Sequence, residues 1–183
     1  MKTLLVVGIA GIALWGILIF NRLVTYRNRT RSGWSDIDVQ LQRRHDLVPR
    51  LVEAVRAYSD YERATMTAVT ELRRQSERTD RPAVKARLED QLARGVDRLL
   101  AVAETYPDLK ADRNFLDLQE QLVDTEDKLQ YARRFYNGAV RELNTRIQSF
   151  PDLIVARTLG FREAEYFEAG ADTGAAPTVR LGS

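Results

Sequence analysis

Four consecutive residues, Arg43-Arg44-His45-Asp46, form the part of this sequence that most resembles a chemical site. A histidine beside a carboxylate can act as a general base, and two guanidinium groups can bind an anion. Neighbouring residues on a helix do not face one another, and a base needs a nucleophile that the sequence does not identify. We therefore interpret the run structurally: cations end one helix, Asp46 caps the next, and a buried His45 bonds the backbone at the reversal between them.

Two glutamates are candidates for buried polar contacts. Glu62 interrupts an apolar stripe and Glu126 lies on the last long helix, and each is a candidate to pair with Arg133 or Arg134. Inward-facing carboxylates in a helical bundle also raise the possibility of a di-iron site, but such sites need two Glu-x-x-His pairs. Because the sequence has only one histidine, we expect no metal site.

The composition excludes further classes of site. The 183 residues include no cysteine, which removes disulfides, thiolate nucleophiles and thiolate metal ligands. The formal net charge is only +2, which does not indicate binding to nucleic acid. We therefore predict a protein that is not an enzyme, holds no cofactor and does not bind nucleic acid.

The N-terminal segment has the composition of a membrane anchor. Residues 3–20 carry no charge and are almost wholly apolar, and at about 1.5 Å per residue they reach about 27 Å, near the minimum for a bilayer. The apolar core of a cleaved signal peptide is usually about 7–15 residues long, and Asn21-Arg22-Leu23-Val24 offers no small-residue cleavage site. We predict an uncleaved transmembrane anchor over residues 1–24.

Positive charge flanks this anchor unevenly. Lys2 precedes it, whereas several arginines follow it. An excess of positive charge marks the cytoplasmic side, so we predict a single-pass protein of the bacterial inner membrane with its N-terminus outside and its domain in the cytoplasm. The arginines would serve as a stop-transfer signal, and they could also contact anionic lipid, at about 1 kcal/mol each. They are Arg22, Arg27, Arg29 and Arg31.

Helical periodicity dominates residues 23–150, where apolar residues recur at steps of three and four. The first helix is expected to leave the membrane and end near residues 42–45, with Pro49 in the first turn of the next helix, where its missing N–H costs nothing. The alternative is one helix kinked at Pro49; we favour the reversal. Three further helices are predicted. The first spans about 47–77, the second begins after a cap at Asp80 and ends before a connector at 106–110, and the third spans about 112–149.

The strongest pattern lies in the last of these helices. Residues 112–127 hold six acids and one base, whereas residues 128–148 hold five bases and one acid, so both ends complement the helix dipole. The pattern predicts an all-α protein, in which an N-terminal transmembrane helix precedes an antiparallel bundle of long helices over residues 25–168. The stripe steps strictly by three and four through Phe115, Leu118, Leu122, Thr125, Leu129, Ala132, Tyr136, Ala139 and Leu143.

A short apolar segment follows the turn at Phe150-Pro151-Asp152. If the helices alternate in direction, this segment lies beside the membrane. It either packs across the base of the bundle, which we favour, or lies in the headgroup region. The residues concerned are Leu153, Ile154, Phe161 and Phe167. Residues 169–183, rich in Ala, Gly and Thr, are expected to form a disordered tail.

Long stretches of the sequence resemble the LemA family of bacterial membrane-anchored helical proteins. The resemblance covers nearly the whole chain after the first twenty residues and is most specific in the run WSDIDVQLQRRHDLVP. It implies an anchor and a helical bundle, and it supplies no catalytic residues to transfer. The matching stretches are Tyr26–Asn28, Trp34–Pro49, Leu51-Val52, Leu116–Gln119, Thr125-Glu126, Tyr131–Asn137, Asn144, Phe150-Pro151, Gly160–Arg162 and Tyr166–Glu168.

Two functional classes follow from these observations. The first is a non-enzymatic scaffold or adaptor that gathers unidentified membrane protein partners, or copies of itself, at the membrane. The second is a membrane-shaping protein that acts by homo-oligomerisation and lipid contact, because the resemblance includes proteins associated with building intracellular membrane compartments in magnetic bacteria. A large ordered assembly would favour membrane shaping, whereas a monomer or small oligomer would favour the adaptor.

Overall fold

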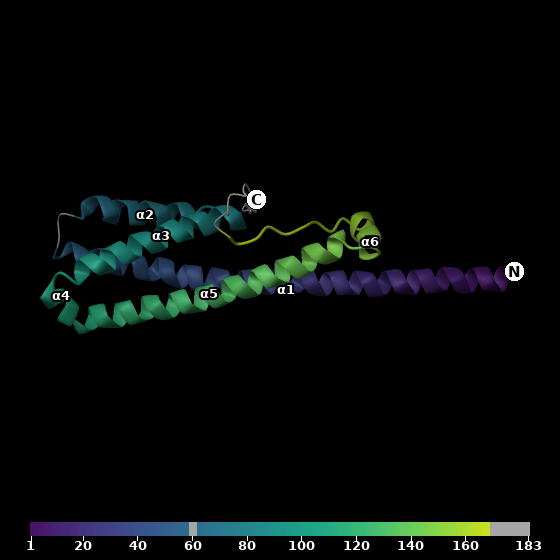
Figure 1. Ribbon diagram of the computed structural model, residues 1–183, viewed down its shortest axis with the longest axis horizontal. Coiled ribbons are helices and arrows are strands. Elements are labelled where there is room, and N and C mark those ends of the chain that lie inside the picture. The colour runs from purple at the N-terminus through teal and green to yellow at the C-terminus, as the bar shows by residue number, and fades with distance from the viewer. Residues whose placement is uncertain (59–61, 169–183) are drawn as a thin grey trace, which may run out of the picture.

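The computed structural model describes residues 1–58 and 62–168, and within them all regular secondary structure is helical (Figure 1). The all-α prediction is confirmed. The expected tail at 169–183 lies outside the described residues. In chain order the helices are α1 (Lys2–Arg56), α2 (Arg63–Glu77), α3 (Pro82–Ala103), α4 (Pro107–Ala111), α5 (Arg113–Gln148) and α6 (Asp152–Thr158).

Helix α1 is a single helix of 55 residues that continues through Pro49, so the predicted reversal at residues 46–49 is wrong. A proline inside a helix costs about 3 kcal/mol. The turns on either side of Pro49 bury Leu47, Val48, Leu51 and Val55, each worth roughly 1.5–3 kcal/mol, and together they outweigh that cost. Asp46 caps no helix; its side chain accepts a hydrogen bond from Gln42 one turn earlier, at 3.1 Å.

The later helix boundaries agree better with the sequence. Helix α2 ends at Glu77 as predicted but begins at Arg63, because residues 47–56 belong to α1. Arg81, and not Asp80, precedes α3, which begins with Pro82 in its first turn. The predicted connector at 106–110 contains the short helix α4. Asp112 caps α5 by accepting hydrogen bonds from the backbone N–H groups of Asn114 and Phe115.

Helices α1 and α5 run antiparallel along most of the molecule, and α2 and α3 form a hairpin against the end of α1 that is distant from the N-terminus (Figure 1). All nine residues of the predicted α5 stripe are buried, which confirms that pattern. The α1–α5 contact is set by pairs such as Tyr26 with Arg146, Gly33 with Tyr136, and Arg44 with Glu126. These pairs keep one antiparallel register from end to end.

The N-terminal part of α1 projects beyond the bundle. Its apolar window has a mean hydropathy of 2.5 and only 6% of it is buried, so it is long and apolar enough to cross a membrane. Ile19 and Leu23 are nevertheless buried against Leu143 and Ile147 of α5. The anchor and the bundle therefore share one uninterrupted helix, and the bundle begins at the last turn of the apolar segment.

Two helical glycines give a test of the α1–α5 contact. A Cβ at Gly33 would lie 3.0 Å from Cδ1 of Phe135 and 3.1 Å from Cα of Tyr136, whereas a Cβ at Gly138 meets nothing within 4 Å. We expect Gly33→Ala to lower the free energy of unfolding by about 1–3 kcal/mol through overpacking. Gly138→Ala should raise it by up to about 1 kcal/mol. Urea unfolding in detergent, followed by circular dichroism, measures both; equal effects would contradict the close approach at Gly33.

Candidate functional site: a buried polar network and an exposed groove

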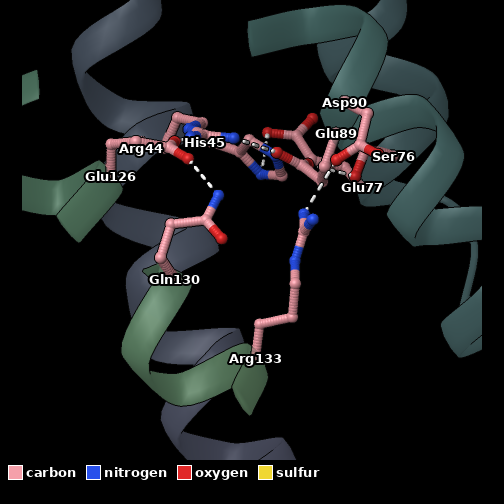
Figure 2. A network of polar contacts seen from close by, with 9 residues as sticks. All are labelled: Arg44, His45, Ser76, Glu77, Glu89, Asp90, Glu126, Gln130 and Arg133. Atoms are coloured by element: carbon pink, nitrogen blue, oxygen red, sulfur yellow. Dashed lines mark hydrogen bonds and ion pairs between the residues drawn. The ribbon is translucent and has the colours of Figure 1, made fainter. Parts of the chain in front are cut away.

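Glu89 of α3 is the centre of a polar network inside the bundle (Figure 2). Its side chain is fully buried, and it receives hydrogen bonds from three residues on two other helices. His45 Nε2 lies 2.6 Å from Oε1, Arg44 Nη1 lies 3.2 Å from Oε2, and Ser76 Oγ donates to Oε1. Charged side chains are almost never buried without partners, and these contacts supply them.

The network extends from Glu89 to α5. Arg44 also forms an ion pair with Glu126, whose other carboxylate oxygen accepts a hydrogen bond from Gln130 at 2.6 Å. Beside it, Arg133 Nη2 donates to Asp90 Oδ1 at 2.8 Å. Glu77 of α2 lies at the edge, 3.8 Å from His45 Nδ1. The network therefore joins α1, α2, α3 and α5, the four long helices of the bundle.

Burial and hydrogen bonding act in opposite directions on the ionisable groups here. Burial alone would raise the pKa of Glu89, but the hydrogen bonds from His45 and Ser76 and the charge of Arg44 hold that pKa below its ordinary value. Burial lowers the pKa of Arg44, and Glu89 counteracts this shift. Since the guanidinium group stays protonated in proteins, Glu89 and Arg44 form a charged pair.

The lowered pKa of Glu89 predicts how stability depends on pH. A depressed carboxyl pKa contributes stability that is fully present above the ordinary value of 4.5 and is lost as the pH falls through the lowered pKa. Urea unfolding measured from neutral pH into this acidic range should show the loss. In a Glu89→Gln variant the free energy of unfolding should fall less steeply over the same pH range. An equal dependence on pH in both proteins would contradict the assignment of this stability to the Glu89 carboxylate.

The sequence identified only part of this network. His45 is buried as expected, but it lies inside α1, eleven residues before its end, and bonds a carboxylate, so its predicted place at a reversal is wrong. Glu126 pairs with Arg44, not with Arg133 or Arg134. Glu62 is half-buried and accepts a hydrogen bond from Thr65 three residues later. Glu89 was missed, although it lies at helical spacing between buried Lys85 and Leu92.

The arrangement favours a structural role for the network. His45 and Glu89 are 3% and 0% exposed, so a substrate would have no access to the base or its carboxylate. Within residues 1–58 and 62–168, no three His, Asp or Glu side chains are grouped so that they could hold a metal ion. The network ties four helices together by directional contacts inside the bundle.

A groove on the surface is a better candidate for binding. It lies between α1 and α5, has a volume of about 580 Å³, and is lined by eight residues of these two helices. Three of them are large exposed side chains: Val39 is 60%, Tyr131 68% and Phe135 48% exposed. Asp36, Asp127 and Lys128 form its polar edge. Exposed apolar side chains that gather at one place on a protein often mark an interaction site.

The four arginines predicted to meet the membrane surface lie on two sides of α1. Their spacing of 100° per residue places Arg22 and Arg29 on one side and Arg27 and Arg31 on the other. Arg22 and Arg31 are exposed. Arg27 lies over the Phe161 ring at 5.2 Å, and Arg29 pairs with Glu142 at 3.5 Å. Their contact with lipid remains a prediction.

The apolar segment after α5 packs mainly on the bundle. Phe167 is fully buried beside Trp34, and Phe161 packs against the core cluster that contains Ile19 and Leu23. Leu153 is half-buried, whereas Ile154 is 55% exposed. The segment thus has one face on the bundle and another face that remains uncovered.

These features define a class of protein: an antiparallel helical bundle whose first helix carries its own membrane anchor. The sequence profile of the LemA family matches residues 33–181, and the chain belongs to this family. The family and the apolar helix together support a membrane protein.

Named relatives agree with this assignment. The chain is 24% identical to magnetosome protein MamQ 2 of Paramagnetospirillum magneticum, over 83% of this chain and 65% of that protein. It is 23% identical to magnetosome protein MamQ of Magnetospirillum gryphiswaldense, over 82% of this chain and 65% of that protein. It is 25% identical to protein LemA of Metamycoplasma hominis, over 81% of this chain and 68% of that protein. The chain therefore spans 65% of the length of the magnetosome relatives.

Proposed function

We propose that this protein is a non-enzymatic adaptor that holds a protein partner at a fixed height above the membrane. The observation that carries the proposal is the exposed groove of Val39, Tyr131 and Phe135 on α1, the helix that also carries the anchor, and on α5. Because α1 is continuous, the groove cannot tilt freely relative to the anchor. At about 1.5 Å per residue, Val39 lies roughly 28 Å along the helix from Phe20.

The partner that fits this groove is a helix with an apolar face and basic residues beside it. Two antiparallel helices leave a furrow into which a third helix can pack its apolar side chains. Asp36 and Asp127 at the edge favour cations on that partner. Two copies of this chain in one membrane would meet at equal heights, so each half of α5 would face the half of like charge on the other copy, which disfavours self-association here.

Site-specific crosslinking tests the adaptor proposal. Photo-crosslinking amino acids at Tyr131 and Phe135 in cells are expected to give an adduct with a different protein, and one at exposed Leu116 on the same helix should give none. Once identified and purified, the partner should bind the reconstituted chain and lose affinity for a Tyr131→Glu, Phe135→Glu variant, while Leu116→Glu leaves binding unchanged. Failure of the purified partner to distinguish these variants would exclude the groove as the docking site.

The similarity to magnetosome proteins supports a second candidate, a membrane-shaping protein that acts by homo-oligomerisation and lipid contact. Crosslinking at Tyr131 would then join two copies of the 20.9 kDa chain. Size analysis in native lipid particles separates the candidates, because membrane shaping requires a large ordered assembly, whereas the adaptor is expected to be a monomer or small oligomer.

We also propose that the chain lies in the bacterial inner membrane with its bundle in the cytoplasm. The excess of arginine after residue 20 supports this orientation. Since the sequence lacks cysteine, a Leu116→Cys variant provides a single label site far from the membrane. An impermeant thiol reagent is expected to label it only after the cells are permeabilised. Labelling on intact cells would reverse the orientation.

A further inference from the structure

The end of α5 lies at the same level as the end of the apolar anchor. Leu143 and Ile147 pack with Ile19 and Leu23 in the core cluster nearest the N-terminus. Continuing the antiparallel register by one turn places Phe150, which follows α5, beside the last turn of the apolar segment. If residues 3–20 cross the bilayer, Phe150 lies at the membrane surface.

Helix α6 is held at this same level by contacts with α1. Ala156 of α6 is fully buried in the cluster that contains Ile19 and Leu23. Just after α6, the Phe161 ring lies edge-on to Phe20 at 5.9 Å, and the Arg27 guanidinium lies over it at 5.2 Å. These two α1 residues are about 10 Å apart along the helix, which places Phe161 in the zone between hydrocarbon and water.

Three large apolar side chains of this region are exposed. Phe150 is 80%, Ile154 55% and Leu159 53% exposed. We call these three residues the interfacial face. Asp152 does not add an exposed negative charge to this face, because its side chain is buried and lies 3.7 Å from Arg146. Two exposed cations lie at the same level, namely Arg157 in the last turn of α6 and Arg22 on α1, two residues after Phe20.

We propose that the interfacial face enters the headgroup region of the bilayer, where Arg22 and Arg157 bind the phosphates of anionic lipids. Apolar side chains beside guanidinium groups are the composition by which interfacial helices bind anionic membranes. The occupant is the bilayer that receives the anchor, because α6 is packed on the helix that crosses it. This inference goes beyond the adaptor proposal, since it assigns a second, lipid-binding surface and would stand if the groove bound nothing.

Single-cysteine labelling in full-length protein tests the position of this face. Phe150→Cys, Ile154→Cys and Leu159→Cys each carry an environment-sensitive fluorophore in proteoliposomes of three parts phosphatidylglycerol to seven parts phosphatidylcholine. Val123→Cys replaces another exposed apolar residue, in the N-terminal half of α5 and far from the anchor, and is the matched control. We expect blue-shifted emission and several-fold stronger quenching by headgroup-proximal spin-labelled lipid at the three positions than at residue 123. Emission and quenching at Ile154 equal to those at residue 123 would overturn the proposal.

Lipid preference tests the role of the two arginines. With the label at residue 154, quenching by spin-labelled phosphatidylglycerol should exceed quenching by spin-labelled phosphatidylcholine at the same mole fraction. Arg22→Gln and Arg157→Gln should each lower that preference by about fivefold, which corresponds to about 1 kcal/mol per arginine at an anionic surface. Arg113→Gln, at the opposite end of α5, should leave it unchanged. Equal quenching by both lipids in the unsubstituted protein would overturn the assignment to anionic lipid.

Discussion

Replacing Glu89 by alanine is expected to lower the free energy of unfolding by about 3–5 kcal/mol. The substitution removes the acceptor for His45, Arg44 and Ser76 at once, and it leaves a cavity in α3. The groups that remain cannot form hydrogen bonds with water instead, because Arg44 and His45 are only 5% and 3% exposed. Urea unfolding of the full chain in detergent, followed by circular dichroism, measures the loss.

Two further variants show where that loss arises. Glu53→Ala removes an exposed glutamate from α1 and should change the free energy of unfolding by no more than about 0.5 kcal/mol. Glu89→Gln keeps the size of the side chain and one acceptor oxygen but removes the charge, so it should cost less than Glu89→Ala. If Glu89→Ala unfolded like the parent and yet abolished partner binding, the structural interpretation of the network would be wrong.

The sequence was most informative where apolar spacing was strict. On α5 the stripe from Phe115 to Leu143 could be predicted residue by residue, because all its members are apolar or aromatic except the small Thr125. Asp112 was expected near the start of this helix, and it is the cap. Long stripes of this kind determine which face is buried with little help from the rest of the structure.

The course of α1 could not be predicted in the same way. Pro49 disfavours a helix locally, and cations followed by an aspartate are typical of a helix end and a new beginning. What decides the outcome is the burial of Leu47, Val48, Leu51 and Val55 against other helices, which is not visible locally. Packing therefore overrides the local preference, and the chain turns after Arg56 instead.

Glu89 was missed because, in the first turns of α3, the large apolar residues do not occupy the buried positions. The large apolar residues there are Val84 and Leu88, but Val84 is 36% exposed, and the buried positions in those turns are Lys85, Ala86 and Glu89. A glutamate in a stripe is normally assigned to the surface. Its partners are 13 and about 45 residues away, so only the assembled bundle identifies it as a core residue.

The C-terminal segment at residues 164–167 returns along the bundle and is held by side-chain amides of α5. Asn144 accepts from the Ala164 N–H at 2.9 Å and donates to its carbonyl at 3.0 Å. One heptad earlier, Asn137 binds the N–H and carbonyl groups of Phe167 at 2.9 and 3.2 Å. Burial raises the pKa of Tyr136 to about 12, so its hydroxyl stays protonated and donates to the Glu165 carbonyl.

The Phe167 side chain holds this segment against the bundle. Phe167→Ala is therefore expected to lower the free energy of unfolding by about 3–5 kcal/mol. The Phe167 ring is fully buried, lies 5.9 Å from the Trp34 ring, and carries the Arg133 guanidinium 5.1 Å above it. Its removal empties a site shared by α1, α5 and the returning segment. The same unfolding measurement applies.

The neighbouring residue provides the matched control. Tyr166 is an aromatic residue one position earlier but is 38% exposed. Tyr166→Ala should therefore lower the free energy of unfolding much less than Phe167→Ala does. Because Phe167 fixes the end of a segment that begins at α6, Phe167→Ala should also make backbone amides at 161–167 exchange faster with solvent hydrogen, while amides in the middle of α5 stay protected. Equal losses of stability in the two variants would show that the Phe167 ring does not hold the segment to the bundle.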